Sequence, residues 1–288
     1  MISSWIQSVP DPADLLSWWD AVVLGVVEGV TEFLPISSTG HLIVAQRALG
    51  YSAGETTNAF NVVIQIGAIT AILALYWRHL FAAVKALRGG SGRGPNLIGQ
   101  IVIAAAPVAL VGLLAREWLH EALFSARVVA GALVIGGVLL LLLERILRRR
   151  SVAGVEVADM SYRTALLIGL WQCLALVPGT SRSGATIAGA LLLGMRRTAA
   201  AEFSFLVGLP VLYGASLVEL YSLRASLQGA LLAPLMIAAG VAFVAALLVV
   251  KPFLAFLKRH DFRVFAYYRI VAGAVIFAMI FTGFLPDA

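Results

Sequence analysis

Residues 28–41 read Glu28-Gly-Val-Thr-Glu-Phe-Leu-Pro-Ile-Ser-Ser-Thr-Gly-His41. This stretch places two carboxylates, a run of three hydroxyls and an imidazole inside a chain that is otherwise strongly apolar. Glu28 and Glu32 are four residues apart and share one helix face, after which a proline and a glycine bracket a segment that cannot continue as regular helix. Because ionisable groups at membrane depth are costly, we interpret this stretch as part of a functional site.

The composition is that of a polytopic membrane protein. Of the 288 residues, 61% are hydrophobic and 12% are charged, whereas soluble domains contain about 25% charged residues. The net charge of +6 comes mostly from Lys and Arg in short loops, for which membrane topology is the first explanation. We therefore expect bilayer lipid around the chain and no nucleic-acid partner. The single cysteine, Cys173, excludes an intramolecular disulfide.

Six stretches are apolar over a length that crosses about 30 Å of hydrocarbon as helix; they are 59–77, 97–115, 126–147, 200–222, 229–250 and 265–284. Two further apolar stretches, 21–50 and 163–194, are interrupted by proline, serine and glycine. Irregular backbone at membrane depth persists only where protein or water satisfies it, so we predict two re-entrant helix-loop-helix hairpins. The expected fold is all-α: one integral membrane domain over 1–288, with six transmembrane helices and these two hairpins.

The two interrupted stretches are related in sequence. A gapless shift of 144 residues aligns Ala21 with Ala165, Gly25 with Gly169, Ser37 with Ser181, Gly40 with Gly184 and Leu49-Gly50 with Leu193-Gly194. Matching interruptions in two halves of a chain are typical of internally repeated membrane proteins. We therefore predict two repeats, 21–144 and 163–288, each of which begins with a hairpin.

Basic residues concentrate in three loops: Arg78, Lys85, Arg88 and Arg93; Arg145, Arg148, Arg149, Arg150 and Arg163; and Lys251, Lys258, Arg259, Arg263 and Arg269. The positive-inside rule places these loops in the cytoplasm. With six crossings, both termini then lie outside, and Trp5, Trp18 and Trp19 fit an interfacial belt. The hairpin 21–50 opens outward and the hairpin 163–194 opens inward, so we expect the repeats to be inverted and the two hairpin tips to meet near the midplane.

The tip of the second hairpin reads Pro178-Gly-Thr-Ser-Arg-Ser-Gly-Ala-Thr186. Arg182 is the lone charge of this region, and its planar fork of donors matches a phosphate or a carboxylate. A helix that starts near Ser183 would direct free N–H groups at the same anion, and Ser181, Ser183 and Thr186 are further candidate ligands. In the alternative, Arg182 only pairs with a carboxylate of the first hairpin and holds the two hairpins together.

Glu28 and Glu32 are candidate ligands of a divalent cation. Two carboxylates against one arginine leave excess negative charge, and Mg²⁺ or Ca²⁺ with water and phosphate oxygens would balance it. In the alternative, one of the two carboxylates carries a proton.

The first loop also contains a candidate nucleophile. Ser38 needs a neighbouring base to act in this way, and His41 is close enough in sequence to serve. Ser37 and Thr39 are expected either to cap the following helix or to contact substrate.

The remaining polar residues of the apolar runs are weaker candidates. Gln65 and Asn61 lie four residues apart and either line the site or make interhelical hydrogen bonds. Glu202 is expected to neutralise Arg196 or Arg197, and Glu144 is expected to form a solvated ion pair. Asp159 adjoins a basic loop in the same way and is a weak candidate for an auxiliary acid or base.

The two blocks, Glu28 to His41 and Pro178 to Thr186, resemble the signature motifs of the bacterial undecaprenyl pyrophosphate phosphatases, the bacitracin-resistance family. The resemblance implies an integral inner-membrane hydrolase that removes the terminal phosphate of C55 isoprenyl pyrophosphate. This reaction recycles the lipid carrier for peptidoglycan synthesis, and thus supports cell shape and resistance to bacitracin. The family depends on a divalent metal, and its site is thought to open to the periplasm, where both termini of this chain would then lie.

The resemblance also implies roles for the motif residues. It places Glu28 and Glu32 at the metal or proton-handling position, Ser38 and His41 at the nucleophile and base, and Arg182 at the phosphate clamp. Within this scheme, His41 as the direct nucleophile is the rival to Ser38.

Two other classes of function stay open at the level of sequence. A transporter or flippase of lipid phosphates would use inverted repeats and the same arginine, and a scaffold of the cell-wall machinery would need no chemistry.

Small residues such as Gly131, Gly136 and Gly137 permit close helix packing within one chain or in a homodimer.

Overall fold

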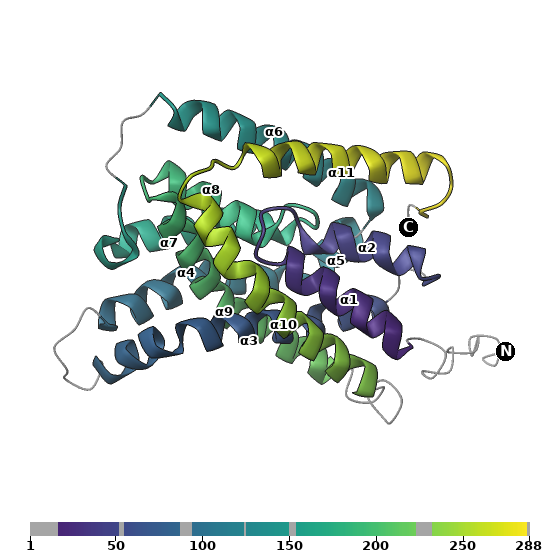
Figure 1. The fold of residues 1–288 in the computed structure, drawn as a ribbon, viewed down its shortest axis with the longest axis horizontal. Coiled ribbons are helices and arrows are strands. Elements are labelled where there is room, and N and C mark those ends of the chain that lie inside the picture. The colour runs from purple at the N-terminus through teal and green to yellow at the C-terminus, as the bar shows by residue number, and fades with distance from the viewer. Residues whose placement is uncertain are drawn as a thin grey trace.

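The structure is a computed structural model that describes residues 17–51, 55–86, 94–123, 125–149, 154–222 and 232–286. Within these ranges the chain is helical, apart from loops and one isolated bridge between Val155 and Met195. The α-helices are α1 (Trp18–Thr31), α2 (Ser38–Ala48), α3 (Glu55–Ala86), α4 (Gly94–Leu114), α5 (Arg116–Leu123), α6 (Ala126–Leu147), α7 (Tyr162–Gln172), α8 (Arg182–Leu192), α9 (Arg197–Ser222), α10 (Leu232–Leu257) and α11 (Arg263–Phe281). Figure 1 shows their arrangement.

Six helices are long and apolar enough to cross a membrane: α3, α4, α6, α9, α10 and α11. The six predicted stretches are therefore confirmed, and the all-helical fold with them. Helix α3 continues to Ala86, beyond the predicted end at residue 77, because its last turns combine Arg78, His79 and Lys85 with apolar residues and can lie at the membrane surface. Many large apolar side chains on these helices face outward, as expected for a surface solvated by lipid; Leu113, Leu114, Leu248 and Val271 are examples.

The two interrupted stretches form the short helix pairs α1–α2 and α7–α8. In Figure 1 the first pair lies toward the end of the molecule that contains both termini, and the second pair lies toward the opposite end. Corresponding helices begin 144 residues apart, at Trp18 and Tyr162 and again at Ser38 and Arg182. The backbone conformation repeats with the same offset, because Ser37 and Ser181 have φ of 68° and 72°, and Gly50 and Gly194 have φ of 92° and 91°.

Small residues bring the short helices close to long ones. A Cβ added to Gly29 of α1 would lie 2.4 Å from the carbonyl oxygen of Ala242 in α10. Likewise, a Cβ added to Gly169 of α7 would lie 2.4 Å from the carbonyl oxygen of Ala104 in α4. This close contact between backbones fixes the depth at which each interrupted pair sits in the bundle.

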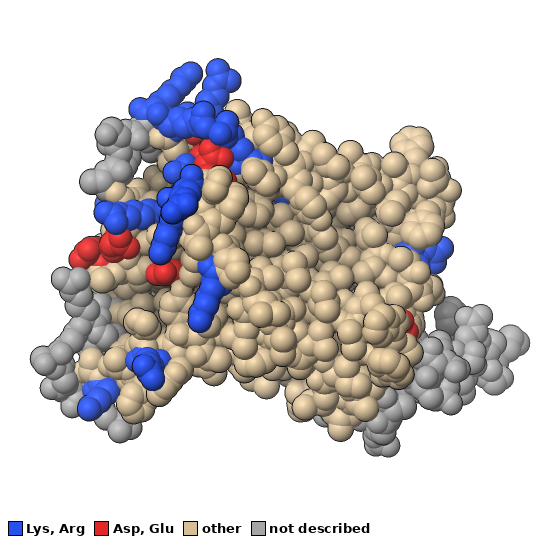
Figure 2. Space-filling model, viewed as in Figure 1, with Lys and Arg blue, Asp and Glu red and all other residues tan. Residues whose placement is uncertain are grey.

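On the face shown in Figure 2, most of the Lys and Arg side chains lie at one end of the molecule, where α6 ends and α11 begins (left). Three charges of the predicted basic loops, Arg88, Arg93 and Arg150, lie outside the described residues, as do Trp5 and the rest of residues 1–16.

Several residues assigned to those loops lie in helices, namely Arg78 and Lys85 in α3, Arg145 in α6, Arg163 in α7, Lys251 in α10 and Arg263 in α11. Arg269 is not in a loop, since it lies in α11 and is 1% exposed.

Two predictions about acidic residues near the basic end were also wrong. Glu144 is fully buried rather than solvated, and it accepts hydrogen bonds from the Arg197 side chain at 2.5 Å and from the Phe262 backbone N–H at 3.0 Å. Glu144 thus joins α6, α9 and the start of α11. Glu202 pairs with neither Arg196 nor Arg197, because these arginines form ion pairs with Glu156 and Glu144. The charged groups that act on Glu202 are Glu156, His79 and Lys258.

Candidate active site

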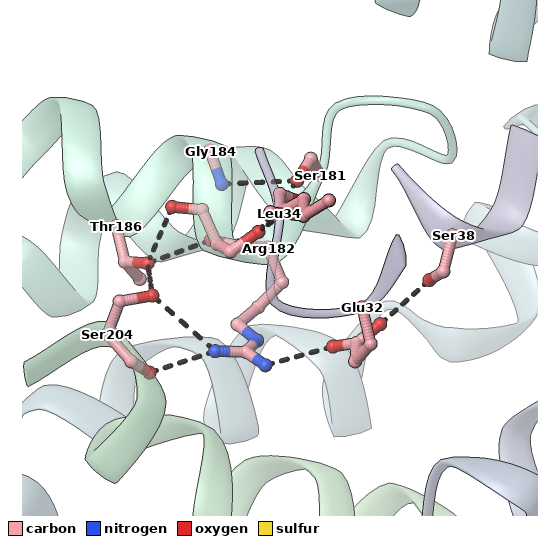
Figure 3. Close-up of polar contacts among 9 residues, drawn as sticks. Glu32, Leu34, Ser38, Ser181, Arg182, Gly184, Thr186 and Ser204 are labelled. Atoms are coloured by element: carbon pink, nitrogen blue, oxygen red, sulfur yellow. Dashed lines mark hydrogen bonds and ion pairs between the residues drawn. The ribbon is translucent and has the colours of Figure 1, made fainter. Parts of the chain in front are cut away.

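The two interrupted stretches meet at the side chains of Glu32 and Arg182. The Arg182 Nη2 donates to Glu32 Oε1 at 2.9 Å, and its Nη1 donates to the backbone oxygen of Ser204 in α9 at 2.8 Å. Figure 3 shows the guanidinium lying between these two partners. Both charged side chains are buried, with 9% and 6% of their surfaces exposed. Gly208 makes room for this guanidinium, since a Cβ there would lie 2.7 Å from Nη1.

Ser38 belongs to the same cluster. It begins helix α2, and its hydroxyl donates to Glu32 Oε2 at 2.7 Å (Figure 3). The two oxygens of Glu32 are therefore shared between Arg182 and Ser38. We call Glu32, Ser38 and Arg182 the central cluster.

Glu28 lies beside the central cluster and is fully buried. Neither of its carboxylate oxygens has a hydrogen-bond partner, and the charged groups that act on it are Glu32 and Arg182. A buried carboxylate without a donor is unstable as an isolated charge. Glu28 therefore requires a proton or a cation.

The carboxylates of Glu28 and Glu32 supply some of the ligands that a divalent cation needs. The two free oxygens of Glu28, next to Glu32, are the hard ligands that Mg²⁺ and Ca²⁺ prefer. Within the described ranges, however, no group of three or more His, Cys, Asp or Glu side chains could hold a metal ion. The residues fit a cation that completes its coordination with water and substrate oxygens, which is usual for Mg²⁺.

The hydroxyls of the second motif bind protein groups. Ser181 accepts the backbone N–H of Gly184 at 3.1 Å and caps α8. Ser183 donates to the backbone oxygen of Leu34 at 2.9 Å and so ties the two loops together. Thr186 lies 2.5 Å from the hydroxyl of Ser204. These bonds hold helix α8 in place, and with it Arg182. Contacts of Ser181, Ser183 and Thr186 with substrate stay a prediction.

His41 is not hydrogen-bonded to Ser38, which differs from the expected nucleophile–base pair. Its Nδ1 lies 2.7 Å from the backbone oxygen of Ser37, and its Nε2 lies 2.7 Å from the hydroxyl of Tyr268 in α11. Sequence reasoning gave no role to Tyr268, because a tyrosine in an apolar helix is unremarkable by itself.

The other candidate residues are more peripheral. Thr39 and Gln65 are half-buried and make no hydrogen bond to the central cluster. Asn61 makes an interhelical pair with Gln46, whose side chain donates to it at 2.8 Å. Asp159 is exposed in the short 3₁₀ turn Val157–Asp159, outside the central cluster.

Arg269 is the second buried arginine of the site, and sequence reasoning missed its role. Its guanidinium donates five hydrogen bonds to backbone oxygens. The acceptors are Pro35 at 3.2 Å, Thr180 at 2.9 Å, Gly179 at 3.2 Å, Ala132 at 3.0 Å and Leu133 at 3.4 Å. The first three belong to the two loops and the last two to α6, so one side chain fastens both loops to a long helix.

The space for this side chain comes from Gly136 of α6. A Cβ there would lie 2.1 Å from Arg269 Nη2. The signal in the sequence was a charged residue inside the predicted span 265–284, which by default indicates a functional position.

Comparisons with known proteins agree with the two motifs. A family model described as "Bacitracin resistance protein BacA" matches residues 21–275. The chain is 48% identical to "Undecaprenyl-diphosphatase" of Parvibaculum lavamentivorans, over 89% of this chain and 94% of that protein. It is 43% identical to "Undecaprenyl-diphosphatase 1" of Acinetobacter baylyi, over 94% and 98% of the two chains. It is 38% identical to "Undecaprenyl-diphosphatase" of Bdellovibrio bacteriovorus, over 93% and 98%.

Replacing Arg269 tests whether it holds the loops. The change Arg269→Met keeps the volume but leaves five carbonyl oxygens without their donor, so we expect the free energy of unfolding to fall by about 3 kcal/mol or more. Thermal unfolding in detergent measures the loss. Arg259→Met, at an exposed arginine of the preceding loop, is the control and should unfold like the wild type. An equally stable Arg269→Met protein would contradict this role.

Proposed function

The chain belongs to the bacitracin resistance protein BacA family, and we propose that the central cluster is where it hydrolyses undecaprenyl diphosphate to undecaprenyl phosphate and inorganic phosphate. It is a polyprenyl diphosphate phosphatase of the membrane, and its product is the lipid carrier that cell-wall synthesis reuses. The observation that carries the proposal for the site is the buried Glu32–Arg182 pair with Ser38 on the same carboxylate. The comparisons give no support to a carrier of lipid phosphates.

The guanidinium of Arg182 has one donor, Nε, that is free to bind a diphosphate. Its Nε is buried and has no hydrogen-bond partner, whereas a guanidinium that served only to join two hairpins would be expected to be saturated. Helices α2 and α8 begin at Ser38 and Arg182, so their N-terminal N–H groups add positive potential at the same place. These features support an anion at the cluster.

Ser38 is proposed as the nucleophile, with Glu32 as the group that receives its proton. The hydroxyl already donates to Glu32 Oε2, whereas His41 binds other partners. The Ser38 oxygen attacks the terminal phosphorus, the bond from that phosphorus to the bridging oxygen breaks, and undecaprenyl phosphate leaves. Water then hydrolyses the phosphoserine and releases phosphate. Arg182 stabilises the charge on the transferred group.

Glu28 and Glu32 are the residues that would hold Mg²⁺ or Ca²⁺. The ion would supply positive charge to the diphosphate oxygens. The unpartnered oxygens of Glu28 support this assignment, and a proton on Glu28 is the alternative.

We also propose that the α1–α2 and α7–α8 pairs are re-entrant hairpins of two inverted repeats in the inner membrane. The 144-residue offset of helix starts and of positive φ angles supports the repeat. The basic end of the molecule (Figure 2) would face the cytoplasm, and the termini and the site would face the periplasm. The polyprenyl tail would remain in lipid.

Replacing Arg182 by alanine tests the proposed function. We expect Arg182→Ala to lower kcat/KM for undecaprenyl diphosphate at least about 10²–10³-fold, the usual effect of losing a donor to the transition state. Arg182→Lys should recover only part of this loss, because an ammonium lacks the planar fork. Phosphate release by purified protein in detergent measures the rates, and Arg163→Ala, at an exposed arginine, is the control. Wild-type rates in Arg182→Ala would remove Arg182 from the mechanism.

A metal at Glu28 is tested without measuring activity. We expect Mg²⁺ or Ca²⁺ to raise the thermal midpoint of the wild type, since a ligand at 100 times its dissociation constant adds about 2.7 kcal/mol to stability. Glu28→Gln should abolish the rise, whereas Glu156→Gln, at an exposed carboxylate, should keep it. If neither cation stabilises the wild type, the proton alternative holds for Glu28.

A further inference from the structure

The hydrogen bonds of His41 determine which of its nitrogens carries a proton. Nδ1 lies 2.7 Å from the backbone oxygen of Ser37. A carbonyl oxygen only accepts hydrogen bonds, so Nδ1 must be the protonated nitrogen. In the neutral imidazole, Nε2 is then the acceptor, and the hydroxyl that donates to it belongs to Tyr268.

The same contacts show where the basic nitrogen points. Nε2 faces Tyr268 at 2.7 Å, and the two rings are parallel with centroids 5.5 Å apart. Ser38 donates to Glu32 instead. The group that faces His41 Nε2 is therefore the phenol of Tyr268, which is 46% exposed.

Tyr268 is held in place by its neighbour. Arg269 follows it in α11 and is fixed by five hydrogen bonds to the two loops and α6. These bonds fix the rotation of α11 about its axis, and with it the direction of the Tyr268 side chain. Helix α11 thus contacts the site through two consecutive residues, although it contains neither signature motif.

We propose that Tyr268 is a positioning residue of the phosphatase reaction: its hydroxyl donates to Nε2, supports the Nδ1-protonated tautomer that the Ser37 oxygen selects, and holds the His41 ring in one direction at the rim of the central cluster. This inference rests on the proposed function. It adds a third element, α11, to a site that the sequence assigns to two motifs.

The test compares Tyr268→Phe with Tyr267→Phe. Tyr267 is the adjacent tyrosine, is 58% exposed and makes no hydrogen bond to His41. We expect Tyr268→Phe to lower kcat for undecaprenyl diphosphate about tenfold or more, with KM and the thermal midpoint unchanged, and Tyr267→Phe to behave as the wild type. A loss confined to kcat separates positioning of His41 from a structural role. A kcat of Tyr268→Phe within about twofold of wild type would overturn the proposal.

A second measurement does not depend on activity. In a protein in which the three other histidines are replaced (His79→Gln, His120→Gln, His260→Gln), ¹⁵N NMR of the imidazole reports His41 alone. We expect a protonated Nδ1 and a hydrogen-bonded Nε2, and in Tyr268→Phe an Nε2 signal shifted toward that of a free acceptor. An unshifted Nε2 signal would also overturn the proposal. If the wild type releases no phosphate, the proposed function is contradicted. The NMR measurement would then still show whether Tyr268 is hydrogen-bonded to His41.

Discussion

The ion pair between Arg182 and Glu32 is the interaction on which the rest of this structure depends. It joins the second interrupted helix pair to the first, and both partners are almost fully buried. Removing one partner of a buried pair typically costs about 3–5 kcal/mol, because the other charge is left uncompensated. The surrounding residues meet this requirement. Ser38 donates to the second oxygen of Glu32, the backbone oxygen of Ser204 accepts from Arg182, and Gly208 leaves space for the guanidinium.

The second requirement is to hold irregular backbone inside an apolar bundle. Ser37 and Ser181 have positive φ, and a residue in such a conformation costs about 1–3 kcal/mol and persists only where its surroundings fix it. Arg269 supplies that constraint by donating to backbone oxygens of both loops. The result is that two helix N-termini, at Ser38 and Arg182, are held near one anion-binding position.

Much of the fold could be predicted from the sequence because hydropathy is read over about 20 residues at a time. The six spans and the two interruptions were visible in this way, and the lone charge of Arg182 opposite Glu28 and Glu32 indicated where the motifs would meet.

Individual side-chain contacts could not be predicted from hydropathy in the same way. Arg269 was counted with loop charges because it lies near the end of its predicted span, and Glu144 was expected in solvent for the same reason. Ser38 was paired with His41 by closeness in sequence, whereas the fold turns its hydroxyl toward Glu32 and turns His41 toward a helix more than two hundred residues away.

The central claim is that Ser38 in this buried cluster attacks the diphosphate. The most direct measurement is to mix the enzyme with undecaprenyl diphosphate labelled with ³²P in its terminal phosphate, quench within one turnover, and locate the label by peptide mapping. The account predicts a phosphoserine at Ser38 that is absent from Ser38→Ala and retained in Ser37→Ala. An active Ser38→Ala enzyme, or label found on His41, would contradict it.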